Sequence, residues 1–236
     1  MYSIKSLIVL AVIMSAVSIA PVVADWPSSL EVGGFKVSDI RGTMDDNGSG
    51  RATGKLALPG GGSTQVDLAC TSAEVITASC RSGFTIANVR IDGTFLLDRR
   101  GMQGTGTINT KGKPISDANI TVDPKRGVTG RGKVHLGSGF SVPVNFEIST
   151  SGVSVKGSAP RQASVDTPLA LYTFKGNVTV SSSGTALKTT ATGSIERTGK
   201  IGGMVSTFGP ITFEVNPQTG DAQVNIGGAN ITIELW

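Results

Sequence analysis

The chain has few of the residues on which catalytic and metal sites usually depend. Its 236 residues include one histidine and two cysteines, and only 16% are charged. A zinc ribbon needs four Cys or His ligands, so these three residues exclude it. Enzymes that rely on histidine as general acid and base are disfavoured as well. The Gly-x-Ser-x-Gly and His-Glu-x-x-His motifs are also missing. We therefore expect a non-enzymatic protein with no catalytic residue, cofactor or metal.

Long apolar runs are absent after residue 24, where no segment approaches the roughly 18 residues of a transmembrane helix. Residues 1–24 combine Lys5, a short apolar run and small residues before Asp25, which is typical of a secretory signal peptide. An uncleaved membrane anchor is the alternative. Cleavage would remove Lys5 and lower the formal net charge from +4 by one. We predict an exported protein that is periplasmic, extracellular or on the cell surface.

Apolar and polar residues alternate along most of the remaining chain, as in Phe140–Ser149. This period of two predicts antiparallel strands that bury one face, and no stretch keeps a helical period. Disorder is not indicated, because disordered chains carry more charge and less Val and Ile. The 32 glycines do not fall at every third position, which excludes collagen. The predicted fold is all-β: antiparallel hairpin repeats in a β-sandwich, jelly-roll-like or elongated meander arrangement. We predict one domain over 25–236, with a sub-boundary suggested at 157–168.

An internal repeat supports this prediction. Leu97–Ile108 recurs as Val122–Val134 and, more weakly, as Ile148–Gly157, with marker glycines 26 and 25 residues apart. Such a length suits one hairpin, and the Asp-x-x-Gly step predicts its turn. Equivalent turns would place their basic residues on one rim, where acidic glycans or anionic lipid headgroups could bind; ordinary solubilising turns are the alternative. Nucleic acid is not expected, because stacking aromatics are scarce. The rim residues are Arg99, Arg100, Lys125 and Arg126, and the marker glycines are Gly101, Gly127 and Gly152.

Several other residues invite a chemical interpretation. Cys70 and Cys80 each end an alternating triplet, and in an exported protein they predict a disulfide, with two buried thiols as the alternative. His135 falls on the polar face of its strand. Asp45–Gly50 resembles the start of a calcium loop, but Leu56 stands where a bidentate Glu belongs, which favours a hairpin turn. Glycosylation would depend on the host; the Asn-x-Ser/Thr acceptors are Asn47, Asn119, Asn177 and Asn230.

The segment Phe174–Val180, followed by Gly184 and Leu187, resembles the strand pattern of periplasmic lipopolysaccharide-transport proteins of the OstA type. This resemblance implies an open jelly roll whose apolar interior holds lipid. One alternative function is a carrier that holds lipid or glycolipid along the apolar face of its sheet. Such a carrier would have an open apolar groove lined by residues such as Val142, Val144, Phe146, Ile211 and Phe213.

The predicted function is a structural or adhesive role in the cell envelope or at the cell surface. Repeated hairpins leave edge strands, through which the protein would assemble with itself or with other envelope proteins. A second alternative, an outer-membrane β-barrel, is suggested by the terminal Trp236, although the apolar residues before it are out of phase with that aromatic. A carboxylate-pair hydrolase would use Asp98 and Asp123, which turn chemistry explains better.

Overall fold

The computed structural model describes residues 24–71, 76–80, 83–137 and 139–236. All but the last residue of the predicted signal peptide therefore lies outside the described residues. Every regular element in the described part of the chain is a β-strand, which confirms the all-β prediction. No helix there is long and apolar enough to cross a membrane.

Eighteen strands follow one another along the described residues, most of them joined by tight turns. They are β1 (Ala24–Asp25), β2 (Ser29–Val32), β3 (Phe35–Met44), β4 (Gly50–Ala57), β5 (Ser63–Cys70), β6 (Ile76–Cys80), β7 (Phe84–Ile86), β8 (Val89–Asp98), β9 (Gly101–Asn109), β10 (Ile115–Asp123), β11 (Gly127–Gly137), β12 (Phe140–Ser149), β13 (Gly152–Asp166), β14 (Ala170–Ser183), β15 (Ala186–Gly199), β16 (Val205–Glu214), β17 (Asp221–Ile226) and β18 (Ala229–Glu234).

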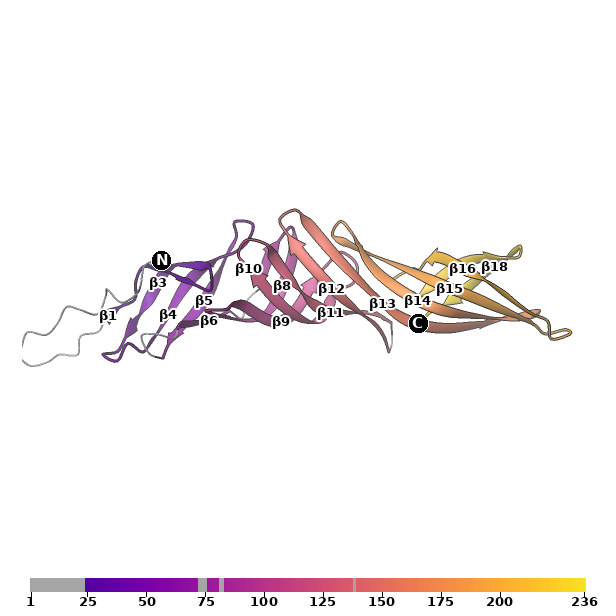
Figure 1. Cartoon of the computed structure of the whole chain (residues 1–236), viewed down its shortest axis with the longest axis horizontal. Helices are drawn as coiled ribbons and strands as arrows, with labels where there is room; N and C mark the ends of the chain where they lie inside the picture. The colour runs from indigo at the N-terminus through magenta and orange to yellow at the C-terminus, as the bar shows by residue number, and fades with distance from the viewer. Residues whose placement is uncertain (1–23, 72–75, 81–82, 138) are drawn as a thin grey trace, which may run out of the picture.

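Sixteen of these strands form one antiparallel sheet, in which consecutive strands along the chain are almost always neighbours. The sheet is open, with β1 at one end of the path and β16 at the other. The molecule is long and narrow, with β1 and β16 toward opposite ends (Figure 1). Of the arrangements expected from the sequence, the elongated meander describes this architecture. The suggested sub-boundary at 157–168 falls largely within β13, which pairs with β14 along Lys156–Asp166.

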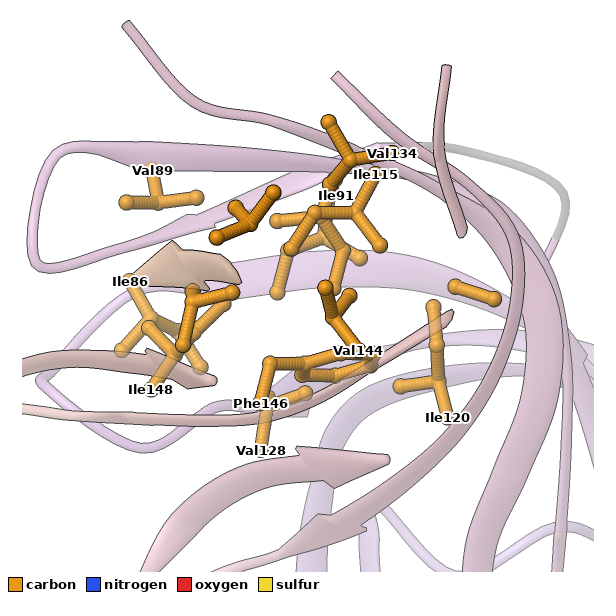
Figure 2. Packing of buried hydrophobic residues seen from close by; sticks show 14 of the residues in the cluster. Ile86, Val89, Ile91, Ile115, Ile120, Val128, Val134, Val144, Phe146 and Ile148 are labelled. Carbon is orange, nitrogen blue, oxygen red and sulfur yellow. The ribbon is translucent and has the colours of Figure 1, made fainter. Parts of the chain in front are cut away.

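The alternation seen in the sequence places one face of each strand in the core. In β12, Phe140, Val142, Val144, Phe146 and Ile148 are all buried, whereas the residues between them are half-buried or exposed. Figure 2 shows side chains from several strands meeting in this interior. One buried row crosses six strands in continuous register; its members are Leu97, Met102, Val122, Val128, Ile148 and the partly buried Val153.

The sheet also coils, so that turns far apart in sequence meet. The β2–β3 turn sits against the β8–β9 turn, where a Cβ on Gly33 would lie 2.3 Å from the carbonyl oxygen of Asp98. A side chain has no room there, which explains a glycine at this position. Gly34 faces the side chain of Pro124 in the β10–β11 turn at 3.4 Å. Coiling therefore brings the N-terminal hairpin onto the turns of the central repeats.

The last hairpin, β17–β18, forms a separate two-stranded sheet that packs on the main one. Its strand β18 contacts β13, and Arg161 of β13 donates a hydrogen bond to the carbonyl of Leu235. The Trp236 ring stacks on Phe140 with 5.8 Å between centroids, and a Cβ on Gly137 would collide with that indole. The C-terminus is therefore anchored on the β11–β12 hairpin.

Candidate functional site

The basic rim, defined as Arg99, Arg100, Lys125 and Arg126, occupies two turns on the same edge of the sheet. Met102 pairs with Val122, so the β8–β9 and β10–β11 turns lie on the same side of β9 and β10. Two strand spacings separate these turns, which is about 10 Å. All four side chains are exposed. The structure thus brings together the four residues that the repeat predicted to be equivalent.

The turns of the basic rim are organised by their aspartates. Asp98 accepts hydrogen bonds from the backbone N–H of Arg100 at 2.7 Å and from its guanidinium at 2.8 Å. Asp123 accepts the backbone N–H groups of Lys125 and Arg126, both at 2.8 Å. These bonds lower the pKa of both carboxyls, with the Arg100 side chain the largest cause at Asp98 and the Arg126 N–H at Asp123. Both carboxylates therefore serve the turns, as the sequence indicated.

The prediction of a disulfide between Cys70 and Cys80 is wrong. Both thiols are buried, as expected, but the β5–β6 hairpin pairs Cys70 with Ile76. Cys80 lies four residues further along β6, which is about 13 Å in an extended strand. A disulfide needs Cα atoms within about 7 Å, so these two described residues are not bridged. Cys80 Sγ instead lies 3.5 Å from the hydroxyl of Thr64.

The remaining candidates from the sequence lie on the surface. Asp45 Oδ1 accepts the N–H groups of Asn47 and Ser49, so the segment that resembled a calcium loop forms the β3–β4 turn. His135 is exposed opposite Ser141. Exposure makes all four Asn-x-Ser/Thr acceptors accessible; these are Asn47, Asn119, Asn177 and Asn230.

The residues expected to line an apolar groove divide into two groups. Val142, Val144 and Phe146 in β12 are buried in the core, and Figure 2 labels Val144 and Phe146 there. Ile211 and Phe213 in β16 are only half-buried, and Phe213 packs edge-on against Phe174 at 5.4 Å. Residues on these two strands therefore do not line a common open groove.

Strand β16 is an unusually bare edge of the main sheet. In the described chain it pairs with β15 alone, and none of its ten residues is buried. Its only charged residue is Glu214, at the end of the strand. The register with β15 shifts between Gly193 and Ile195, next to Pro210, which leaves two regular segments. The other end of the sheet carries only the short strands β1 and β2.

Sequence reasoning missed one surface, which we call the apolar tip: Pro168, Leu169, Leu171, Ile201, Met204 and Val205. These residues lie in and beside the β13–β14 and β15–β16 turns. Ile201 is 86% exposed, Met204 74% and Leu169 68%. Leu96, on β8, is the other large apolar residue with high exposure among those described. The signal in the sequence was the run Gly199–Val205, where glycines flank apolar residues in a turn.

Two shallow depressions accompany these surfaces. One, of about 430 Å³, lies beside the apolar tip and is lined by residues that include Leu169, Tyr172, Phe208 and Ile231. The other, of about 420 Å³, lies on β3–β5 and is polar. Its acid, Asp39, forms an ion pair with Lys55 at 2.9 Å, and the Lys55 hydrogen bond lowers the pKa of Asp39. A carboxylate held ionised in this way is a weak proton acceptor.

The whole chain was also compared with known proteins. No protein-family model, curated protein or solved structure matches it. The local resemblance of Phe174–Val180 to lipopolysaccharide-transport proteins therefore gains no support from a match over the whole chain.

Proposed function

We propose that this is an exported, non-catalytic protein with a structural or adhesive role in the cell envelope or at the cell surface, assembling through strand pairing at β16. The observation that carries the proposal is the bare β16 edge at the end of an open sixteen-stranded sheet. An edge strand presents unpaired N–H and C=O groups that accept a further strand. The protection of this ten-residue edge is limited to Glu214 at its end and to Pro210 with the register shift beside it, which leaves the segments on either side open to pairing.

The partner in this proposal is a second copy of the chain. If the edge of one copy that carries β1 and β2 pairs with β16 of another copy, the contact is head-to-tail. Repeated contacts of this kind would join the elongated molecules end to end. Pro210 removes one backbone donor from β16, so pairing would use the segments on either side, Val205–Phe208 and Ile211–Glu214. Both segments already pair with β15, which holds them extended.

A matched pair of lysine substitutions tests this assembly. Thr207 is exposed on β16 opposite Glu196, and Thr129 is exposed on the interior strand β11 opposite Glu147. Thr207→Lys places a charge on the free edge strand. T129K adds the same charge, and again opposite a glutamate on the neighbouring strand, but in the interior of the sheet. Sedimentation velocity over a wide concentration range should show association of the wild type and T129K, and monomer for T207K. Wild type that stays monomeric throughout rejects the proposal.

The basic rim supplies a second contact surface, for acidic glycans or anionic headgroups. Of its four cations, Arg100 is the one that forms an ion pair with a described residue. Exposed cations that attract a polyanion do so through long-range electrostatics, which salt screens. We expect binding to heparin, used as a model polyanion, that weakens with salt and is lost when Arg99, Lys125 and Arg126 are changed to Gln. Binding of the triple variant equal to that of the wild type contradicts this role.

A further inference from the structure

Apart from Val205, which also begins β16, the apolar tip is a surface that the proposed function does not use. Its residues come from two turns that lie side by side, because the N–H of Lys200 donates to the carbonyl of Leu169 at 3.0 Å. Both turns follow long strands that reach the end of the molecule away from β1 (Figure 1). Apolar side chains with exposures up to 86% therefore gather on a narrow protrusion.

We propose that the apolar tip inserts into the surface of a lipid bilayer. A protein partner fits this feature less well, because a stable protein interface uses about 20–30 residues a side and the tip presents six. A bilayer needs no complementary groove, and each apolar side chain that enters the acyl boundary contributes separately. The first described strand, β1, lies toward the opposite end of the molecule (Figure 1).

Backbone groups at the base of the apolar tip have hydrogen-bond partners. This matters because polar groups that enter a bilayer without partners are strongly unfavourable. Here Thr167 N–H donates to the Ala170 carbonyl at 3.0 Å, and Ala170 N–H donates back to the Thr167 hydroxyl at 3.1 Å. In the second turn, Gly199 N–H donates to the Met204 carbonyl at 2.8 Å. These backbone groups at the base of the tip are thus paired within the turns.

Charge at the base of the apolar tip is also balanced. Asp166, the last residue of β13, forms an ion pair with Lys200 at 2.6 Å. The carboxylate therefore does not stand alone against the negative surface of a membrane. The tip and the basic rim lie on opposite sides of the meander. The turns that contain Gly152 and Gly184 lie on the same side as the basic rim, whereas the β13–β14 and β15–β16 turns lie at the other ends of these strands. Attachment through the tip is consequently separable from binding of anions at the rim.

Vesicle flotation with the purified protein tests the inference. Ile201→Asp with Met204→Asp should lower the fraction bound to phosphatidylcholine vesicles about tenfold or more, because two inserted side chains become charged. Leu96→Asp is the matched control, since Leu96 is 52% exposed on β8 and distant from these turns, and it should bind like the wild type. The conservative change Ile201→Leu with Met204→Leu should also bind. Equal unfolding midpoints would show that the variants fold.

A second readout reports insertion directly. An environment-sensitive fluorophore on Met204→Cys should shift to the blue when vesicles are added, whereas the same label on Ser151→Cys, in the opposite β12–β13 turn, should not. Failure of wild type to bind phosphatidylcholine, or equal binding by the Asp variant, overturns the inference. Binding only to equimolar phosphatidylcholine and phosphatidylglycerol, lost with the rim variant, would also overturn it in favour of headgroup attraction. Loss of self-association in the Asp variant without vesicles would also overturn the inference, because it would identify a second copy as the partner of the apolar tip.

Discussion

Lys200 and Leu169 are joined by a backbone hydrogen bond of 3.0 Å, although 31 positions separate them in the sequence. This bond makes one unit of the two turns that carry the apolar tip. The first residue of β16, Val205, follows the second of these turns directly. The membrane-contacting surface that we infer and the edge strand that we propose for assembly are therefore structurally connected.

The central turns provide a test of the repeat at the level of backbone conformation. Gly101 and Gly127 have φ angles of 114° and 106°, so alanine is strained at both. A Cβ at Gly101 would meet nothing within 4 Å, but at Gly127 it would lie 2.2 Å from the carbonyl oxygen of Ile148. We expect Gly101→Ala to lower the free energy of unfolding by about 1 kcal/mol and Gly127→Ala by about 3 kcal/mol. Equal losses in urea unfolding would contradict the close packing of the second turn.

The buried row across the central strands predicts large effects from single core truncations. Ile148 is fully buried in β12 between Val128 and Val153. Ile148→Ala should lower the free energy of unfolding by about 2–5 kcal/mol, through lost burial and a cavity. Leu96→Ala, on an exposed face, should change it by no more than about 0.5 kcal/mol. Chemical denaturation of both variants measures the difference, and a small effect at Ile148 would show that the core is not closed there.

Stability should fall in acid, through the turn aspartates. Asp98 and Asp123 have pKa values lowered from 3.8 in the folded protein, so their stabilisation is present above about that pH. It is lost as the pH falls through the lower folded-state values, because protonation removes the charge that the N–H groups and Arg100 bind. As the pH falls below about 5, the Asp98→Asn, Asp123→Asn double variant should therefore lose less stability than the wild type. Parallel pH profiles of the urea midpoint would refute this assignment.

Reductant should leave the protein unchanged, because Cys70 and Cys80 are not bridged. The thermal unfolding midpoint should therefore be the same with and without dithiothreitol. A disulfide across a loop of this length would stabilise by about 3 kcal/mol. A clear drop in the midpoint on reduction would therefore contradict the hairpin register of β5 and β6.

The strands and the repeat turns were predictable because their signals are local. The alternation in Phe140–Ser149 determines which face of the strand is buried, and Asp123 with Gly127 determines a turn. Neither of these two predictions needs knowledge of distant residues. The basic rim followed from the same repeat, since equal spacing puts equivalent turns on one edge. These predictions depend on period and turn chemistry alone.

Register and coiling were not predictable from the sequence. Cys70 and Cys80 both face inward, as the alternation predicts. Alternation does not determine the register of the hairpin, however, and the observed register pairs Cys70 with Ile76, four residues before Cys80. The apolar tip depends on two separate turns meeting beside one another. Pro168 and Ile201 each read as ordinary turn residues in sequence, and only the pairing of β14 with β15 brings them together.

Hydrogen exchange along β16 tests the assembly proposal most directly. Amides of β16 that point away from β15 have no strand partner in the described single chain, so they should exchange rapidly when the protein is dilute. As the concentration rises, we predict that these amides gain protection, whereas those of the interior strand β14 stay protected throughout. Exchange of the β16 amides that remains rapid at every concentration would contradict assembly through this edge.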